Sequence, residues 1–357
     1  MARNWANLPQ ELLVLCSQRL CPKDLSAFRA VCHSWRFAAV EERSDVPWLM
    51  LADEEGTRWR EFFCLSCQLV HKALLPEAKG KRCFFSRGWM LTMGKEGELH
   101  MLKNPMSCRD HIIKLPNLNK FLAIQNSRLL RTYGAYIFKF ALSDSPATSP
   151  DYKVVVIYRN CRRLWLWKPG DEEWSSVTSK YYVNDVIFYR GCFVILNRGG
   201  SILRFDADGP TPLEAQVVFK MPRGLLGREQ TYLVQSVTGS LLLVSRQGQR
   251  TRKGTFRFHI FEIDLDNRTW TGVKNLGNMS LFVGCNSSFS LEVDQKHHIK
   301  SNCIYFIDDF FSWSKLTKEG GGTDMGIYHL EDGSIEPHID WISDSQFSPP
   351  LWIEPSF

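Results

Sequence analysis

The chain has 357 residues, of which 44% are hydrophobic and 23% charged, and its formal net charge is +6. This composition argues against a mainly disordered chain, and the length favours two domains, or one small domain beside a large one. The longest apolar runs, such as residues 12–16, fall far short of the roughly 18–20 residues of a membrane span, and the charge is too mild to indicate nucleic acid by itself, so we expect neither as a partner.

The first 45 residues predict three short helices. Pro9 suits the first turn of a helix, where its missing N–H costs nothing. Apolar residues then recur at helical spacing, at Leu12, Leu13, Cys16 and Leu20 and again at Leu25, Phe28, Val31 and Cys32, with Trp35 after them. About 40 residues in short helices bury little surface alone. We therefore expect this apolar stripe to meet a partner, a neighbouring domain, or both.

Residues 46–79 show neither a clear helical period nor a clear strand period. An apolar patch at residues 48–51 precedes a charged run at 53–55. We interpret this segment as a connector that packs on the following domain.

From about residue 80 the pattern changes to a period of two. Short runs rich in Val, Ile, Phe, Tyr and Trp, such as residues 89–93, 154–158 and 164–167, alternate with turns that contain Gly, Asp, Asn or Pro. Aromatic residues make up 13% of the chain, which is typical of many half-buried strands. No long amphipathic segment separates the strands, so a parallel α/β sheet is disfavoured.

A degenerate repeat runs through these strands. An aromatic strand leads into an acidic or glycine turn, and in three cases a tryptophan follows, at Trp174, Trp270 and Trp313. The spacings scatter around the ~40–50 residues of one propeller blade. We expect about six blades, with five or seven as the other counts, and these tryptophans buried between sheets. An ordinary array of β-sandwiches is the alternative.

Two stretches of the chain resemble a known family. Leu8-Pro9 with Leu12 and Leu13, Leu20 with Asp24, and Val31-Cys32 before Trp35-Arg36 form a pattern that resembles an F-box. The rest is similar to the propeller of plant F-box proteins of the kelch-like, KIB-like group. The stretches that carry this similarity are residues 88–92, 97–100, 167–174, 186–191, 261–264 and 352–356.

The resemblance implies an α+β multidomain fold and a role in protein recognition. An all-α F-box of three helices (residues 1–45) would dock on a Skp-type adaptor and, through it, a cullin. A connector (46–79) and a β-propeller (80–357) would follow, and the propeller would bind an unknown protein substrate for ubiquitination. The protein would then be the substrate-recognition subunit of a Skp–cullin–F-box (SCF) ubiquitin ligase and not itself an enzyme. The alternatives are an F-box scaffold that acts outside the ligase and a propeller enzyme.

The apolar stripe supplies the expected adaptor contacts. Burial of one such side chain contributes about 1.5–3 kcal/mol. The residues are Leu8, Pro9, Leu12, Leu13, Leu20, Val31 and Trp35. For any single member the alternative is simple packing in the core of the helices.

Cysteine and histidine residues give a weak metal signal. Cys64-x-x-Cys67-x-x-x-His71 has half of a zinc spacing, and Cys83 could supply the fourth ligand, but the gap to Cys83 fits no known finger. We therefore expect an apolar patch, with no metal or cofactor.

The 11 cysteines are scattered and odd in number, and the N-terminus lacks the apolar stretch of a signal peptide. This favours reduced thiols and a nuclear or cytoplasmic location.

Basic residues crowd the segment from Arg246 to Arg257. A solvated hairpin loop is the simpler interpretation. The alternatives are a handle for an acidic substrate on the open face of the propeller, formed by Arg250, Arg252 and Lys253, or part of a nuclear-import signal. No Walker, dinucleotide-binding or Gly-x-Ser-x-Gly motif is present, and no residue suggests a catalytic nucleophile.

Overall fold

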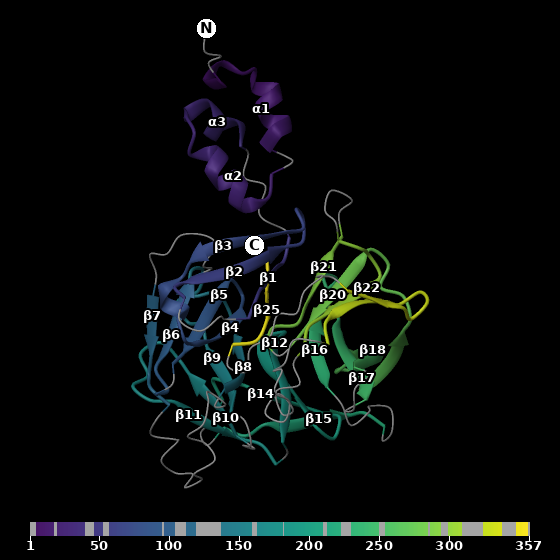
Figure 1. Ribbon diagram of the computed structural model, residues 1–357. Helices are drawn as coiled ribbons and strands as arrows, with labels where there is room; N and C mark the ends of the chain where they lie inside the picture. The colour runs from purple at the N-terminus through teal and green to yellow at the C-terminus, as the bar shows by residue number, and fades with distance from the viewer. Residues whose placement is uncertain are drawn as a thin grey trace.

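Three helices open the computed structural model, and a ring of strands follows (Figure 1). The structure describes residues 5–17, 20–39, 46–52, 57–94, 96–103, 112–118, 137–158, 163–180, 182–209, 213–222, 230–249, 254–284, 286–293, 299–308, 324–337 and 348–355. A 3₁₀ turn (η1, Trp5–Asn7) precedes the helices α1 (Gln10–Ser17), α2 (Pro22–Arg29) and α3 (His33–Ala38). Figure 1 shows the helices standing apart from the ring, next to β1–β3.

The helices form a small core of their own. Leu13, Phe28 and Ala38 are buried in it, and Trp35 packs against Phe28 with ring centroids 4.4 Å apart. Pro22 occupies the first turn of α2, after Cys21 in an extended conformation. That position needs no N–H donor, so the break at residues 21–22 both ends one helix and starts the next.

Six antiparallel or mixed sheets make up the ring, and we number them as blades in chain order. Blade 1 contains β1 (Trp48–Met50), β2 (Trp59–Cys64), β3 (Leu69–Leu74) and β25 (Leu351–Ile353), and the short turn η2 (Pro76–Ala78) follows β3. Blade 2 contains β4 (Arg82–Ser86), β5 (Trp89–Met93), β6 (Leu99–Lys103) and β7 (Ile112–Leu115). Blade 3 contains β8 (Ile137–Leu142), β9 (Val154–Tyr158), β10 (Arg163–Trp167) and β11 (Ser175–Thr178).

The other half of the ring has the same plan with one addition. Blade 4 contains β12 (Val183–Tyr189), β13 (Cys192–Asn197), β14 (Ser201–Phe205) and β15 (Gln216–Lys220). Blade 5 contains β16 (Thr231–Gln235), β17 (Leu241–Gln249), β18 (Gly254–Asp264) and β19 (Thr269–Val273). Blade 6 contains β20 (Met279–Val283), β21 (Phe289–Glu292), β22 (Cys303–Phe306), β23 (Gly326–His329) and β24 (Ile335–Glu336), with β20 and β22 parallel.

The expected fold class is confirmed: a helical N-terminal region precedes a six-bladed β-propeller. One edge strand of each blade faces the centre, and these strands (β25, β4, β8, β12, β16 and β21) contact one another in turn. The C-terminal strand β25 pairs with β1, so that Ile353 lies opposite Trp48 and the two ends of the propeller close one blade. Such closure leaves no long unpaired edge.

This closure changes the interpretation of residues 46–79. They do not form a connector, because they supply β1, β2 and β3 of blade 1. All three residues of β1 are buried, since the strand lies between β25 and β2. A three-residue strand covered on both faces shows no alternation, so a periodicity argument cannot detect it.

The tryptophans after the closing strands differ in burial. Trp174 is buried, and its indole N–H donates to the carbonyl oxygen of Pro116 at 2.8 Å, which joins blade 3 to the end of blade 2. Trp270 was expected to be buried, but 36% of it is exposed on the outermost strand β19. It lies edge-on to Phe261, with centroids 5.4 Å apart, and covers the blade from outside. Trp313 lies outside the described residues.

In the described part of the chain, no helix combines the length and the apolar character that crossing a membrane requires.

Candidate partner-binding surfaces

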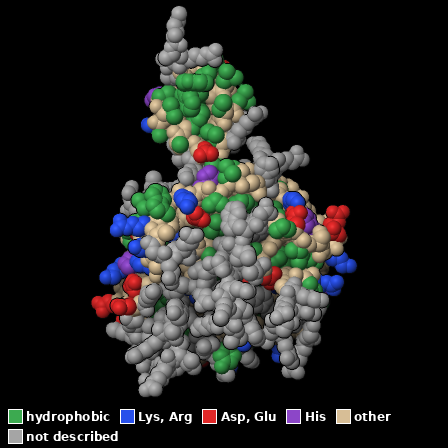
Figure 2. All heavy atoms as spheres, viewed as in Figure 1, with side chains coloured by type: hydrophobic (Ala, Val, Ile, Leu, Met, Phe, Trp, Pro, Cys, Tyr) green, Lys and Arg blue, Asp and Glu red, His purple; other side chains and the backbone are tan. Residues whose placement is uncertain are grey.

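The helical region exposes an unusual amount of apolar surface. The exposed residues of this group are Trp5, Pro9, Leu12, Leu15, Val31 and Phe37. Leu12 is 49% exposed and Val31 56%. Figure 2 shows hydrophobic side chains gathered on the visible surface of the helices. Contiguous apolar patches of this kind mark interaction sites more often than free surface.

The structure divides the expected adaptor contacts into three groups by burial. Leu13 is 1% exposed and lies in the core of the helices, so it does not reach the surface. Leu8, Leu20 and Trp35 are half-buried and pack against that core. The surface members of the set are Pro9, Leu12 and Val31.

Sequence reasoning missed two exposed side chains of this region. Leu15 and Phe37 lie off the apolar stripe, and 55% and 76% of them, respectively, are exposed. A large apolar residue outside a core-facing stripe is the signal that could have identified them.

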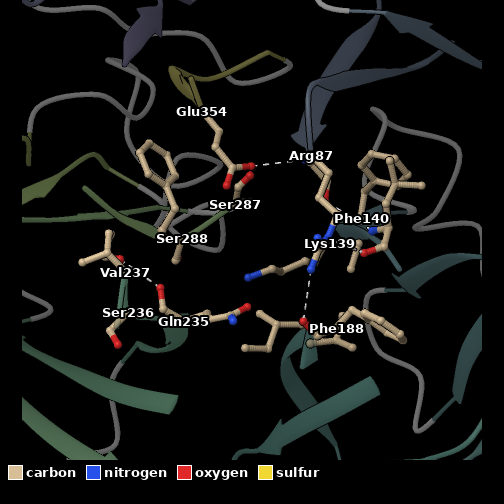
Figure 3. Close-up of a pocket in the computed structure, with 17 residues that line it drawn as sticks. Arg87, Lys139, Phe140, Phe188, Gln235, Ser236, Val237, Ser287, Ser288 and Glu354 are labelled. Carbon is tan, nitrogen blue, oxygen red and sulfur yellow. Dashed lines mark hydrogen bonds between the residues drawn. The ribbon is translucent and has the colours of Figure 1, made fainter. Parts of the chain in front are cut away.

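The centre of the propeller holds a cavity of about 420 Å³. It lies where β4, β8, β12, β16 and β25 end and β21 begins, so every blade contributes to its wall. Figure 3 shows the lining side chains around the centre, with Lys139 pointing into it. Among them are Arg87, Phe140, Phe188, Gln235, Ser288 and Glu354. Aromatic rings and a few converging polar groups are typical of recognition pockets.

Arg87 connects four blades at this cavity. It has a φ of +46° and precedes Gly88, with a φ of +78°, in the turn between β4 and β5. Two left-handed residues in succession make the tight hairpin turn whose twist matches the strands. The guanidinium group of Arg87 donates to the carbonyl oxygens of Leu142 at 3.1 Å and Phe188 at 3.4 Å. Its backbone N–H donates to a carboxylate oxygen of Glu354 at 3.2 Å, and burial raises the pKa of that carboxyl group.

Comparison with known proteins agrees with this architecture. Residues 62–329 match the family model of the KIB1-4 beta-propeller, and residues 5–45 match that of the F-box domain. The chain belongs to the KIB1-4 beta-propeller family. An F-box domain precedes its propeller, as the sequence motifs indicated.

Relatives of this KIB1-4 propeller include F-box proteins of a plant, Arabidopsis thaliana. The F-box/kelch-repeat protein At1g57790 of Arabidopsis thaliana is 25% identical over 98% of this chain and 94% of its own length. The F-box protein At3g56470 of the same plant is 24% identical over 88% of this chain and 86% of its own length. The F-box protein SKIP23, also from Arabidopsis thaliana, is 23% identical over 98% of this chain and 95% of its own length.

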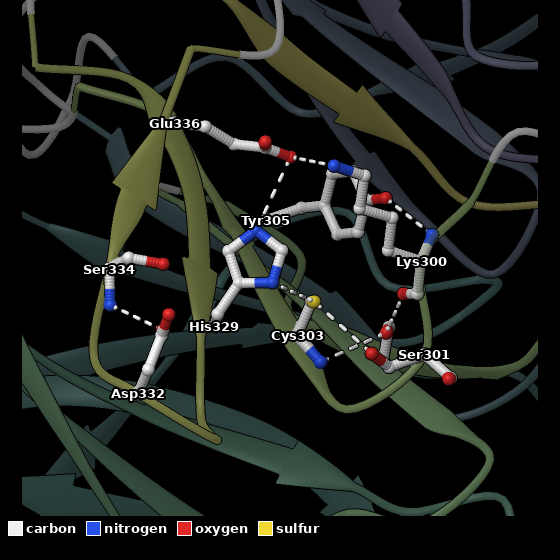
Figure 4. Close-up of polar contacts among 9 residues, drawn as sticks. Lys300, Ser301, Cys303, Tyr305, His329, Asp332, Ser334 and Glu336 are labelled. Carbon is white, nitrogen blue, oxygen red and sulfur yellow. Dashed lines mark hydrogen bonds and ion pairs between the residues drawn. The ribbon is translucent and has the colours of Figure 1, made fainter.

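Blade 6 of the KIB1-4 propeller contains a chain of contacts that resembles a nucleophile triad (Figure 4). The Cys303 sulfur lies 3.4 Å from Nδ1 of His329, whose Nε2 lies 3.3 Å from a carboxylate oxygen of Glu336. However, Cys303 is 1% exposed, burial raises the pKa of its thiol to about 11, and the thiol donates to the carbonyl oxygen of Ser301 at 3.1 Å. Because reactivity requires an accessible thiolate, this cluster serves the packing of blade 6.

The basic segment of blade 5 is only partly described. Arg250, Arg252 and Lys253 lie outside the described residues, so the proposed substrate handle stays a prediction. Gln235 lines the cavity and pairs with Leu241 at one end of β17. Gln249 and Gly254, which flank the basic residues in the sequence, pair at the other end of β17. The basic segment therefore begins and ends at the end of blade 5 that is away from the cavity.

Arg246 does not belong to a solvated loop. It is fully buried and donates to Thr255 at 2.6 Å, to the carbonyl oxygen of Ile307 at 2.8 Å and to Asp324 at 2.9 Å. Its guanidinium group also lies 4.8 Å from the ring centre of Phe306. This arginine therefore joins blade 5 to blade 6, and sequence alone cannot separate it from its basic neighbours.

In the structure, the residues of the half-zinc motif meet Cys21 and not the expected fourth ligand, Cys83. The side chains of Cys64, Cys67 and His71 lie in one group with Cys21. Cys83 lies apart from this group, with its sulfur 3.5 Å from a guanidinium nitrogen of Arg60.

Proposed function

We propose that this protein is the substrate-recognition subunit of an SCF ubiquitin ligase. F-box domains in general bind Skp-type adaptors, and the F-box match covers the helical region of this chain. The observation that carries the proposal is the apolar surface of Pro9, Leu12, Leu15, Val31 and Phe37, which neither the helical core nor the propeller covers. Such a surface on a small domain is best explained by a partner.

The adaptor would cover this surface. Leu12 and Val31 would become fully buried, with about 1.5–3 kcal/mol from each side chain. Leu8, Leu20 and Trp35 would contribute their exposed edges, and Leu13 would act through the helical core. A cullin would join through the adaptor, and the ubiquitin chemistry would belong to these partners. The nucleus and the cytoplasm are the locations in which we expect this assembly.

The propeller would select the substrate. Its central cavity offers the exposed amide group of Gln235 beside the half-buried ring of Phe188. This arrangement suits a protein segment that inserts one side chain and hydrogen-bonds around it. Gln249 and Gly254, which flank Arg250, Arg252 and Lys253, lie at the end of β17 and β18 away from the cavity. These basic residues would therefore steer an acidic substrate from the other side of the propeller.

Capture from plant cells with the proteasome inhibited tests this proposal. Wild-type protein should retain a Skp-type adaptor and a cullin, and the double variant Leu12→Asp/Val31→Asp should lose both, since a buried charge without a partner is costly. A matched control is Ile112→Asp/Val217→Asp, which places the same charges on exposed apolar positions of the propeller and should bind the adaptor normally.

The recovery of adaptor and cullin distinguishes a ligase subunit from an F-box scaffold. Equal adaptor recovery from both double variants would contradict the assigned surface. Recovery of the adaptor without a cullin from the wild-type protein would instead indicate an F-box scaffold outside the ligase.

Replacement of Ser288 by Trp should fill the cavity and reduce substrate capture while leaving adaptor binding unchanged. Substitution of Arg250, Arg252 and Lys253 by Ser should weaken capture of acidic substrates, most clearly at low salt.

A further inference from the structure

Four potential metal ligands meet where the F-box touches blade 1. Their ligand atoms, the sulfurs of Cys21, Cys64 and Cys67 and one imidazole nitrogen of His71, all lie within 4.8 Å of one another. Nε2 of His71 is 3.6 Å from the Cys21 sulfur and 3.1 Å from the Cys67 sulfur. Cys21 comes from the residue before α2, whereas the other three come from β2, β3 and the turn between them.

These separations suit a tetrahedral zinc ion. Zn–S bonds of about 2.3 Å and Zn–N bonds of about 2.0–2.1 Å place sulfur and nitrogen ligands ~3.5 Å apart, and two sulfur ligands ~3.8 Å apart. The S···N distances of 3.1 and 3.6 Å bracket the first of these values. Three thiolates and one imidazole form a complete structural zinc set, with no position left for water or substrate.

The turn between β2 and β3 has the geometry of a metal-binding loop. Gln68 has a φ of +58°, and its backbone N–H donates to the carbonyl oxygen of Cys64 at 2.9 Å. In the same turn the Cys64 sulfur lies 3.0 Å from the hydroxyl oxygen of Ser66. Polar contacts of this kind outside the ligand set accompany metal sites.

The surroundings of the cluster are largely apolar, although Cys67 is half-buried and the Asp24 carboxylate lies 3.4 Å from the Cys21 sulfur. Cys21, Cys64 and His71 are buried, and the imidazole ring lies 5.2 Å from the ring centre of Trp48. Cys21 joins the apolar cluster of blade 1 that contains Met50 and Phe62. Polar sulfur and nitrogen atoms crowded into such a cluster are better satisfied by one shared cation than by one another.

We propose that Cys21, Cys64, Cys67 and His71 bind a structural zinc ion that fixes the F-box to blade 1. Binding exchanges three thiol protons for three Zn–S bonds and uses the lone pair of neutral His71, without any change of oxidation state. The ion would hold α2 at a set position relative to the propeller, and hence the adaptor relative to the substrate. The proposal does not depend on the ligase function, because the ligands are independent of the adaptor surface.

Metal analysis of the full-length protein tests the proposal. Protein purified in zinc-containing medium without chelators should hold about one zinc per chain. Single replacement of Cys21, Cys64 or Cys67 by Ser should reduce the zinc content at least about fivefold, since one of four ligands is lost. The matched controls are Cys83→Ser and Cys303→Ser, which remove buried thiols outside the cluster and should retain the ion.

A rescue variant distinguishes ligand loss from misfolding. His71→Ala should lose zinc, whereas His71→Cys should retain it as a four-thiolate site. Cobalt substitution of wild-type and His71→Cys protein should give the intense visible bands of a tetrahedral sulfur-ligated ion.

Thiol protection in the wild-type protein gives a test that needs no variant. With zinc bound, Cys21, Cys64 and Cys67 should resist alkylation, whereas Cys16, which is exposed, should react. A chelator should expose the three protected thiols, and added zinc should restore their protection. Zinc-free wild-type protein that does not take up zinc would overturn the proposal, as would a disulfide between two of these cysteines or zinc loss from Cys83→Ser alone.

Discussion

Lys139 and Asp185 form an ion pair between β8 and β12 in which only 4% and 2% of the two side chains are exposed. The carboxylate of Asp185 also accepts backbone N–H groups from Val186 and from Leu233, each at 2.7 Å. These contacts join blades 3, 4 and 5 beside the central cavity. Burial raises the pKa of Asp185, and the ammonium group of Lys139 opposes that shift.

Breaking this pair should destabilise the propeller strongly. Asp185→Asn leaves the buried ammonium group of Lys139 without a counter-charge, for which we expect a loss of about 3–5 kcal/mol in the free energy of unfolding. The double variant Lys139→Met/Asp185→Leu removes both charges and should recover much of that loss. Denaturant unfolding of the three proteins measures both effects.

An exposed pair provides the control. Arg190 and Asp266 are 3.2 Å apart with side chains 66% and 79% exposed. Asp266→Asn should leave the unfolding midpoint almost unchanged, because solvent screens such pairs. If Asp185→Asn and Asp266→Asn behave alike, the buried pair does not hold the blades together.

The blades could be predicted from sequence because their strands are short runs rich in aromatic and branched residues that end in recognisable turns. Residues 89–93 and 154–158, for example, form β5 and β9, which are buried along their whole length. Blade 1 could not be predicted in this way, since Trp48–Met50 is paired with a strand from the other end of the chain. That pairing is a long-range contact and leaves no local period.

The candidate sites show the same division between local and long-range signals. The apolar stripe of the F-box is local, so its members were found, but the spacing could not show that Leu13 faces the core and Leu12 the solvent. Three of the four members of the metal cluster, Cys64, Cys67 and His71, were recognisable as a motif in the sequence. Its fourth member, Cys21, lies in another domain and becomes a neighbour only when the chain folds.

Leu12 and Leu13 are adjacent in α1 and should respond oppositely to truncation. Leu13→Ala removes a buried side chain from the helical core, and we expect it to reduce F-box stability by about 2–5 kcal/mol. Leu12→Ala should leave stability nearly unchanged and weaken adaptor binding. Hydrogen exchange of α1–α3 measures the first effect, and adaptor affinity measures the second. Equal loss of protection in both variants would show that Leu12 also belongs to the core.

The two described tryptophans that follow closing strands should also differ. Trp174→Ala removes a buried ring and its hydrogen bond to Pro116, so we expect a cost of about 3–5 kcal/mol. Trp270→Ala removes a ring that only covers Phe261 from outside, and its cost should be clearly smaller. Thermal unfolding of both variants under the same conditions tests the order. A larger shift for Trp270→Ala would contradict the burial that the structure gives.

Two histidines should make the propeller sensitive to mild acid. Burial lowers the pKa of His100 and of His259, and in both cases nearby positive charges add to the effect, from Lys81 and Lys114 for His100 and from Arg257 for His259. A folded-state pKa below the unfolded value of about 6.5 means that the unfolded chain binds protons first as the pH falls. Stability is therefore fully present above that pH and decreases as the pH drops below it.

Replacement of both histidines isolates this effect from other acid-labile groups. The double variant His100→Gln/His259→Gln keeps His71 and every carboxyl group, so the difference between variant and wild type reports these two imidazoles alone. Unfolding midpoints measured at pH 7.5 and pH 5.5 should fall less for the variant than for the wild type. The same drop in both proteins would show that neither imidazole resists protonation in the folded state, and the acid response would then have to come from the groups that the two proteins share.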